Sequence, residues 1–278
     1  MTTTSLFYRL VRRAGAALQG RLACFETAVS MVRGKNGIEI GGPSQVFRPE
    51  SQLLPIYDQV GSLDNCDFSR TNTWAEHTDA FAFSEGRISG NTIFAEGSDL
   101  RAVPDRQYDF VLSSHNLEHF ANPVKALKEW QRISRPHGGL ILALPNYRFT
   151  FDHRRAPTPV AHMFEDYSRG AREDDLTHLD EILREHDRAL DPESGSAEEF
   201  RLRSLNNFRN RCLHHHVFNK QNVSELLTGI GAEVLAVETA WPYHIFALAR
   251  FPGPNREERI TETCVTAQTA MIHSHEHP

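Results

Sequence analysis

Apolar runs separated by segments of helical periodicity extend over most of the chain. Five of these runs predict strands, because each is short, apolar and bounded by turn residues: residues 36–41, 59–65, 91–97, 108–114 and 138–145. The last run, "GGLILALP", is apolar throughout, which is typical of a strand buried on both faces of a parallel sheet. The stretch 123–134 predicts a helix, because a proline starts it and its apolar residues recur at helical spacing: Pro123, Val124, Leu127, Trp130 and Ile133.

The same pattern continues toward the end of the chain. Residues 223–239 show a helical part, a glycine stop and an apolar strand, and residues 243–251 give one more strand signal. Alternation of strands and helices in a chain of domain size is typical of an α/β fold. We therefore predict a Rossmann-like, doubly wound, seven-stranded sheet with helices on both faces.

The alternation breaks once, over residues 147–216, which are polar and rich in charge and histidine. A segment of this length is too long for a simple connection after the fifth strand. It leaves the sheet at the carboxyl edge, where ligands bind in such folds, so we interpret it as a largely helical, substrate-binding insertion. The remaining units are an N-terminal helical segment (1–35), the core domain (36–146 and 217–251) and a C-terminal tail (252–278).

The first 25 residues contain arginines and no acid, and Leu6, Leu10, Ala14 and Leu18 fall on one helical face. A transit peptide or a membrane-surface helix would have this composition. We prefer a helix that packs on the domain, because nothing resembles a cleavage site. The tail holds three histidines that could take up a metal, although we interpret it as a loose terminus: His273, His275 and His277.

Composition excludes several classes of protein. The 278 residues are 40% hydrophobic and 24% charged, with a formal net charge of -6, so no global basic field points to nucleic acid. No apolar run reaches the roughly 20 residues of a membrane span. Four cysteines without CxxC spacing indicate reduced thiols in a cytoplasmic protein: Cys24, Cys66, Cys212 and Cys264.

Polar side chains follow the predicted strands at their carboxyl ends. In "GIEIGGPSQVF", Glu39 stands just before Gly41 and Gly42. The glycines permit a tight turn and a close approach of backbone to ligand. An acid at this turn would repel a diphosphate, so the turn suits a ligand with a cationic or hydroxyl-rich centre.

The next strand ends offer matching groups. Asp64 closes the second predicted strand, where a carboxylate would take both ribose hydroxyls of an adenosine. Asp99 can accept from an adenine amino group while Leu100 lines the ring. The predicted set of cofactor contacts is therefore Glu39, Gly41, Gly42, Pro43, Ser44, Asp64, Asp99, Leu100, Ser114 and His115.

These pieces resemble a known family. "EIGGPS", "GSDL", "YDFVLSSHNLEHFANPVKALKEWQRISRPHGGLILALPN" and the final strands are similar to class I S-adenosylmethionine-dependent methyltransferases. The resemblance covers residues 36–146 and 217–251. It implies S-adenosylmethionine as cofactor and methyl transfer as the reaction. Two features depart from the family pattern: His137 before the glycines, and a turn with two glycines and a proline in place of three spaced glycines.

The insertion resembles a narrower bacterial group of sugar O-methyltransferases that act on methylmannose polysaccharide. This resemblance implies a sugar or oligosaccharide hydroxyl as the acceptor. Two other functions stay open: a non-catalytic scaffold that binds the cofactor or a glycan, and a methyltransferase for nitrogen or for a small natural product. A homodimer is among the assemblies that the sequence allows.

A sugar hydroxyl must lose its proton to a base, bind a metal ion, or both. The motif "FDHRR" follows the fifth strand, and we predict His153 as the general base. Asp152 would orient that imidazole or bind a metal, and Arg154 and Arg155 would hold the acceptor. The alternative interpretation is a charged loop that pairs with the acidic insertion.

The motifs "EDDLTH" and "HHH" add carboxylates and imidazoles. Carboxylates suit Mg²⁺ or Mn²⁺, and imidazoles shift the preference toward transition metals. The predicted metal ligands are Asp152, Asp174, Asp175 and His216, with His214 and His215 as substrate contacts. Alternatively, these histidines only bond acceptor hydroxyls or cap the insertion.

Overall fold

The computed structural model describes residues 20–73, 76–84 and 87–253. Eight strands of this part of the chain form one sheet in the order β3-β4-β2-β1-β5-β6-β8-β7. Their bounds are β1 Asn36–Ile40, β2 Ser62–Asp67, β3 Ala80–Ser84, β4 Arg87–Phe94, β5 Tyr108–Ser114, β6 Ser134–Pro145, β7 Glu233–Ala240 and β8 His244–Arg250.

The sheet has a parallel core and an antiparallel end. Strands β4, β2, β1, β5 and β6 pair in parallel, and β8 and β7 complete the sheet as an antiparallel pair. This confirms the predicted Rossmann-like α/β fold. The chain moves outward from β1 to β4 and then returns to β5, so the switch point lies between β1 and β5, where ligands bind in such sheets.

Two features of the sheet differ from the prediction. An extra edge strand, β3, pairs antiparallel with β4 and brings the number of strands to eight in the described residues. Strand β2 begins three residues later than predicted and continues to Asp67. Its last residues, Asn65, Cys66 and Asp67, are buried although two of them are polar, so an apolar pattern could not locate the end of this strand.

Helices in the described chain have the bounds α2 Phe25–Val32, α3 Pro123–Ile133, α4 Val160–Ser168, α5 Leu179–Glu185, α6 Ala197–Leu205, α7 Asn207–Asn210 and α8 Lys220–Gly229. Helices α3, α4 and α8 cover one face of the sheet. The predicted apolar stripe of α3 is fully buried there, with Trp130 among the largest core side chains. The Asn122 side chain caps this helix by accepting from the Lys125 amide.

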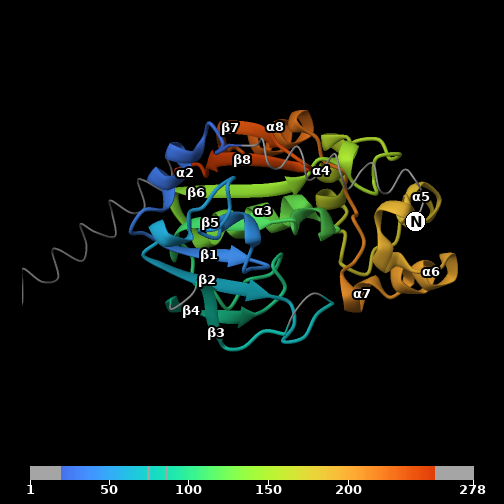
Figure 1. Ribbon diagram of the computed structural model, residues 1–278, viewed down its shortest axis with the longest axis horizontal. Helices are drawn as coiled ribbons and strands as arrows, with labels where there is room; N and C mark the ends of the chain where they lie inside the picture. Colours follow the sequence, from blue (N-terminus) through green and yellow to red (C-terminus); the bar gives the residue numbers. More distant parts are fainter. Residues whose placement is uncertain (1–19, 74–75, 85–86, 254–278) are drawn as a thin grey trace, which may run out of the picture.

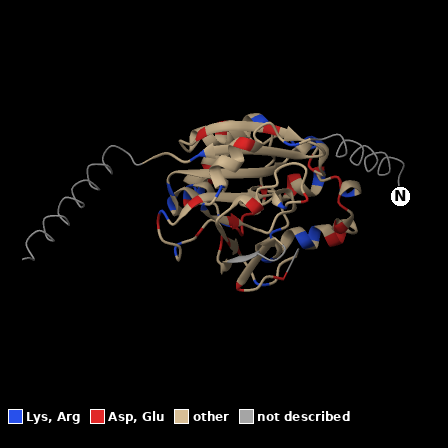
Figure 2. Ribbon diagram, turned by 60° about the vertical axis from the view of Figure 1, so that its left-hand side comes forward, with Lys and Arg blue, Asp and Glu red and all other residues tan. Residues whose placement is uncertain are grey.

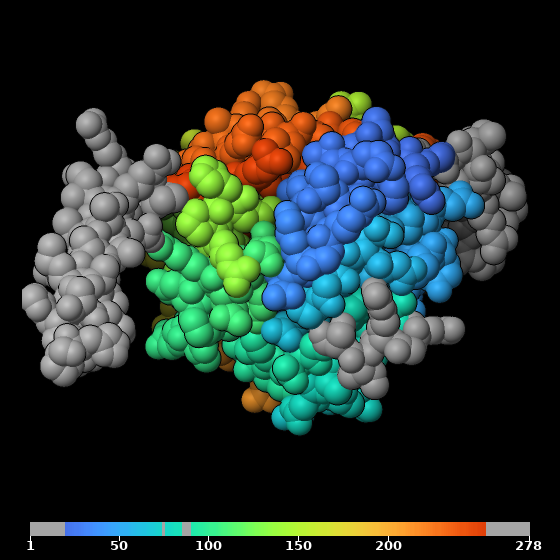
Figure 3. Space-filling view, turned by 90° about the vertical axis from the view of Figure 1, so that its left-hand side faces the viewer, coloured from blue at the N-terminus to red at the C-terminus, as the bar shows by residue number. Residues whose placement is uncertain are grey.

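The other face is covered by α2 and by the irregular segment 41–61. A continuous helix cannot form in that segment because Pro43, Pro49 and Pro55 interrupt it. Two short 3₁₀ turns replace it, η1 Gln45–Phe47 and η2 Tyr57–Gln59. We predicted helices on both faces of the sheet. On this face the only α-helix in the described chain is α2. In space-filling view the first described residues lie beside the C-terminal strands, where the Ala23 amide donates to Glu238 (Figure 3).

The insertion lies beyond the carboxyl ends of the parallel strands, at the side toward which the arrows of β1, β2 and β5 point (Figure 1). Helices α5 and α6 share a small core of Ile182, Phe200 and Leu213. The insertion is helical in short pieces: α5 ends at Glu185 and the 3₁₀ turn η5 Arg188–Leu190 follows. The other 3₁₀ turns are η3 Leu117–His119, η4 Tyr147–Phe149 and η6 Pro192–Ser194.

Acidic and basic residues are interspersed along the ribbon of the described chain (Figure 2). None of the described helices has the length and apolar character that crossing a bilayer requires. Cys24, Cys66 and Cys212 are free thiols. The predicted amphipathic face at Leu6 to Leu18, Cys264 and the tail histidines lie outside the described residues.

Candidate active site

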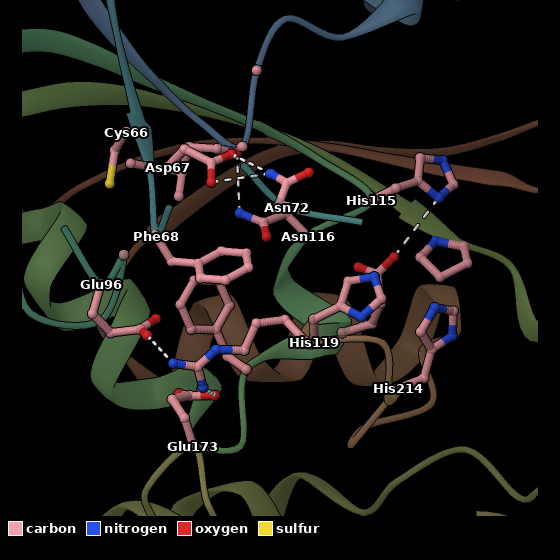
Figure 4. A pocket seen from close by; sticks show the side chains of 18 of the residues that line it. Cys66, Asp67, Phe68, Asn72, Glu96, His115, Asn116, His119, Glu173 and His214 are labelled. Carbon is pink, nitrogen blue, oxygen red and sulfur yellow. Dashed lines mark hydrogen bonds and ion pairs between the residues drawn. The ribbon is translucent and has the colours of Figure 1, made fainter. Parts of the chain in front are cut away.

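A cavity of about 520 Å³ opens at the carboxyl ends of the parallel strands, around the switch point between β1 and β5. Figure 4 shows side chains from several strand ends and from the insertion projecting into it. The residues that line it are Ile40, Gly41, Gly42, Pro43, Cys66, Asp67, Phe68, Asn72, His77, Glu96, Gly97, His115, Asn116, Glu118, His119, Phe120, Pro145, Phe149, Thr150, Phe151, Glu173, Leu190, Arg211, His214 and Tyr243.

The glycine turn after β1 forms one wall. Gly41 has φ +79°, and an added Cβ would lie 3.0 Å from Asn116 Nδ2, so the position favours glycine. Its amide donates to the Cys66 carbonyl at 2.8 Å, and the Gly42 amide donates to Asn65 Oδ1 at 2.9 Å. Because both amides are used inside the protein, the turn offers a close-approach surface rather than a row of free donors.

Glu39 does not face the cavity, contrary to the prediction. Ile38 and Ile40 pack on the face covered by α3 and α8, so strand alternation turns Glu39 to the other face. There it is fully buried and accepts from Ser44 Oγ at 2.5 Å and from the Tyr57 hydroxyl at 2.6 Å. Burial raises the pKa of Glu39 to about 7.

The glycine turn is therefore braced from below by Glu39 and Ser44. An added Cβ at Gly42 would come within 2.4 Å of Glu39 Cδ, so glycine is required where the turn crosses the carboxyl group. Ser44 is buried in this brace and does not line the cavity. Of the predicted turn contacts, Gly41, Gly42 and Pro43 do line it.

Asp64 is also displaced from its predicted place, because β2 extends past it. Asp64 accepts from the Asn91 amide and from the Tyr108 hydroxyl, both at 2.8 Å, and lies outside the cavity lining. Asp67 ends the strand and lines the cavity instead. Its carboxylate accepts from Asn72 Nδ2 at 3.1 Å and lies 3.2 Å from His77 Nε2.

At the third and fourth parallel strand ends, the predictions succeed only in part. Asp99 pairs with the exposed Arg101, and Leu100 is fully buried in the core, so neither lines the cavity. Glu96 and Gly97, just before them, do line it. Ser114 ends β5 outside the lining, whereas His115 lies in it, as predicted.

His115 and Glu118 form the wall next to β5. His115 adopts φ +50°, and its Nε2 lies 2.8 Å from His244 Nδ1. Its Nδ1 is 3.8 Å from Glu118 Oε1. Burial raises the pKa of Glu118 to about 7, and within the described chain its Oε2 has no hydrogen-bond partner. A buried, unpartnered carboxyl oxygen beside a cavity is a candidate for contact with a ligand.

Asp152 and His214 form a candidate acid–base pair, in which His214 lines the cavity and Asp152 is buried outside its lining. Asp152 Oδ2 lies 2.6 Å from His214 Nδ1, and its Oδ1 accepts from Arg155 Nη1 at 2.9 Å. Burial disfavours the charged imidazole, but the Asp152 carboxylate outweighs it, so the pKa of His214 is raised. In the other direction, His214 and Arg155 overcome burial and lower the pKa of Asp152 to about 2. Asp152 therefore orients the imidazole of His214, whereas the sequence prediction paired it with His153 or with a metal.

His153 is not the residue that this carboxylate orients. Its Nδ1 lies 3.1 Å from the Thr150 carbonyl, its Nε2 lies 3.6 Å from Asp187, and it is absent from the cavity lining. Arg154 bonds Asp187 at 2.9 Å and is half exposed. Arg155 is buried and donates to the His214 carbonyl at 2.8 Å, so it supports the pair instead of facing an acceptor.

The four predicted metal ligands do not come together. Asp174 is exposed beside Arg172, and Asp175 bonds Thr177 and Arg169. Two groups in the described residues do place three donor atoms within 4.8 Å of one another: Glu118, His119 and His214, and separately His162, Asp166 and His178. The predicted metal ligand His216 is buried next to Asp166. The predicted substrate contact His215 is also buried and bonds Asn207 outside the cavity.

Sequence reasoning missed Asp67, Glu96 and the aromatic wall of Phe149, Phe151 and Tyr243. Asp67 is the last residue of β2 and Glu96 lies two residues after β4, so better strand ends would have found them. No local signal marks the aromatic residues, because they approach the cavity from the insertion and from the turn between β7 and β8.

Comparison with known proteins agrees with this architecture. Residues 62–142 match a family model described as a methyltransferase domain. The matched residues run from the start of β2 into β6 and include several of the strand ends around the cavity. No curated protein sequence matches the chain.

Solved structures with a similar course of the chain include three methyltransferases. A SAM-dependent methyltransferase from Aquifex aeolicus is 13% identical, with a TM-score of 0.44, over 81% of this chain and 87% of that one. One from Methanosarcina mazei is 13% identical, with a TM-score of 0.45, over 84% and 100%. The 1,6-didemethyltoxoflavin-N1-methyltransferase of Burkholderia thailandensis is 11% identical, with a TM-score of 0.44, over 83% and 79%.

Proposed function

We propose that the protein moves the methyl group of S-adenosylmethionine to a hydroxyl of a sugar or oligosaccharide, with His214 as the general base. The observation that supports it is the 2.6 Å contact between the buried Asp152 and His214, whose side chain lines the cavity. An imidazole held through Nδ1 by a carboxylate is the arrangement that general bases use to take a hydroxyl proton.

The residues at the strand ends fit the cofactor. Asp67 ends β2 where a carboxylate can accept from ribose hydroxyls, and Gly41 and Gly42 leave space for close approach. The bound cofactor supplies an activated methyl group on sulfur. This chain has to hold acceptor and methyl carbon in line and to take up the proton that the acceptor loses.

The acceptor half of the cavity suits a hydroxyl. A hydroxyl is a poor nucleophile at neutral pH and needs a base, whereas an amine acceptor needs less help. In the proposed step the acceptor oxygen bonds the methyl carbon, the carbon–sulfur bond breaks, and the hydroxyl proton passes to His214. Burial lowers the pKa of His119, and it lowers that of His115 as well, so both remain neutral hydrogen-bond partners for acceptor hydroxyls.

The mixture of rings and polar groups supports a sugar as the acceptor. Phe149, Phe151 and Tyr243 give apolar faces, while imidazoles and carboxyl groups offer several donors and acceptors to a polyhydroxylated ligand. Phe151 is held against the insertion by stacking on His186 at 4.3 Å between ring centroids. The narrower hypothesis of a methylmannose polysaccharide acceptor rests on the resemblance of that insertion.

A divalent cation is the second candidate means of activation. Glu118, His119 and His214 each present a donor atom to a common space. His119 Nδ1 lies 3.1 Å from the Leu213 carbonyl and His214 Nδ1 faces Asp152, which is how outer groups orient metal-bound imidazoles. A cation there would lower the pKa of an acceptor hydroxyl directly.

Transfer of a tritiated methyl group to a panel of mannosides, glucosides and amines tests the proposal. We expect labelling of glycosides, loss of labelling in His214→Gln and nearly unchanged labelling in His153→Ala. Labelling of amines only would contradict a hydroxyl acceptor, and full activity of His214→Gln would contradict the base. The same assay is repeated with EDTA, and labelling that survives chelation would contradict the cation.

A further inference from the structure

The insertion contains a second cluster of histidine and carboxylate side chains, apart from the cavity. His162 and Asp166 lie one turn apart on α4, and His178 directly precedes α5. None of the three lines the cavity. Their three donor atoms all lie within 4.8 Å of one another, so side chains from two separate segments converge on one point.

The spacing of these atoms suits a shared ion. His162 Nε2 lies 3.1 Å from His178 Nε2 and 3.5 Å from Asp166 Oδ2. In a tetrahedral zinc site with bonds of about 2.0–2.1 Å, the donor atoms are about 3.3 Å apart. These two distances lie on either side of that value, and the donor atoms of the third pair, His178 and Asp166, lie within 4.8 Å of each other, so movements of the side chains would bring all three atoms to one ion.

Asp166 supplies an independent sign of a ligand. Its side chain is 1% exposed, and its Oδ1 accepts from Arg169 at 2.7 Å. The other oxygen, Oδ2, points into the cluster and has no hydrogen-bond partner among the described residues. A buried carboxylate oxygen left without a partner is costly, and coordination of a cation would remove that cost.

The outer side of the cluster is also arranged as in metal sites. His162 Nδ1 lies 3.7 Å from Glu165, and His178 Nδ1 lies 3.7 Å from Glu181. These distances exceed a hydrogen bond, but a carboxylate near the far nitrogen favours a proton on Nδ1 and so leaves Nε2 free for a metal. His216 Nε2 is 3.5 Å from Asp166 Oδ2 but also 3.3 Å from the Ala121 carbonyl, so we assign it a supporting position.

We propose that His162, Asp166 and His178 bind a divalent transition metal, of which zinc fits the donor set well, and that this ion fastens the loop between α4 and α5 to the body of the enzyme. Two imidazoles and one carboxylate are a common zinc donor set. Helix α4 is anchored in the main core through Met163. The loop carries Glu173, which lines the cavity and accepts from the Ala121 amide at 3.3 Å.

Metal content measured by mass spectrometry of untagged, zinc-dialysed protein tests the site. We expect His162→Ala and His178→Ala each to lose one equivalent of zinc relative to wild type. His153→Ala is the matched control and His214→Ala separates this site from the cavity cluster; both should keep that equivalent. The His162 side chain is 35% exposed, so its variant should stay folded by circular dichroism. Folded His162→Ala and His178→Ala with wild-type zinc content would overturn the proposal.

Limited proteolysis tests the fastening separately, and it needs no activity. The Arg172 side chain, in the loop, is 78% exposed and open to trypsin. Zinc should slow cleavage after Arg172 at least several-fold in wild type and leave the rate unchanged in His162→Ala. Equal cleavage of wild type with and without zinc, despite bound metal, would overturn the fastening role.

Discussion

Two buried glutamates, Glu39 and Glu118, lie at neighbouring strand ends, and burial raises the pKa of each to about 7. Their surroundings differ. Glu39 lies beneath the glycine turn, and its two oxygens accept from Ser44 and Tyr57. Glu118 lines the cavity, and its Oε2 is without a partner within the part of the chain that is described.

This comparison shows that burial and a shifted pKa do not by themselves mark a catalytic group. A carboxyl group with both oxygens bonded to its own protein acts as a brace, because its hydrogen bonds hold a turn in place. A carboxyl group with a free oxygen toward a cavity keeps a cost that only a ligand, a cation or a proton can remove. The pattern of partners therefore separates structure from function where burial does not.

The largest effect on catalysis is expected at the cavity, for the carboxylate that holds His214. Asp152→Asn should lower kcat by about 10²- to 10⁴-fold, because the carboxylate no longer stabilises the His214 imidazolium as the proton is taken up. The acidic limb of kcat/KM should also move to lower pH, because the raised pKa of His214 falls when the carboxylate is lost.

Binding of S-adenosylhomocysteine, measured by calorimetry, is the control for Asp152→Asn and should stay within a few-fold of wild type. An unchanged pH limb would show that Asp152 does not set the protonation of the base.

The two glutamates should respond alike in stability and differently in catalysis. Each has a folded-state pKa of about 7, above the ordinary value of 4.5. The folded state therefore loses stability as pH rises from about 4.5, and the loss is complete above about pH 7. When the pH is raised from 5 to 8, the free energy of unfolding of Glu39→Gln and of Glu118→Gln, measured in urea, should each increase by about 3 kcal/mol relative to that of wild type.

Turnover at pH 8 then separates the two variants. Glu118→Gln should lower kcat/KM about tenfold or more, as expected for loss of a charged contact in the site, while Glu39→Gln stays near wild type. Equal losses in the two variants would break the comparison.

The two aspartates of β2, Asp64 and Asp67, allow the same comparison for binding of the cofactor. Asp67→Asn should weaken S-adenosylhomocysteine binding about 10- to 100-fold, the effect of losing a charge-assisted hydrogen bond. Asp64→Asn should leave the affinity unchanged, because Asp64 is bonded to Asn91 and Tyr108. The reverse order of affinities in calorimetry would return the ribose contact to Asp64.

The smallest effect is expected beneath the turn. Tyr57→Phe removes the hydroxyl that donates to Glu39 and accepts from the Ser44 amide at 2.6 Å. We expect a loss of about 1–3 kcal/mol in the free energy of unfolding at pH 7, with methyl transfer retained in the folded protein. A wild-type midpoint in urea would show that the brace contributes nothing to stability.

The amino-acid sequence by itself determined the order of the sheet elements. The runs at 108–114 and 123–134 match β5 and α3 within one residue at each end. Continuous burial in a parallel sheet and one buried helical face impose local patterns that can be read without a structure. The same reading placed His115 and the glycine turn at the cavity, because parallel strand ends share one edge of the sheet.

Only the tertiary structure decided which polar groups face that cavity. Asp152 and His214 are 62 residues apart and meet through the course of the insertion, which no local periodicity encodes. Asp67 could not be recognised while buried polar residues concealed the end of β2. Side-chain direction and long-range partners arise from packing, so they separate His214 from His153, and Glu118 from Glu39, among residues of identical chemistry.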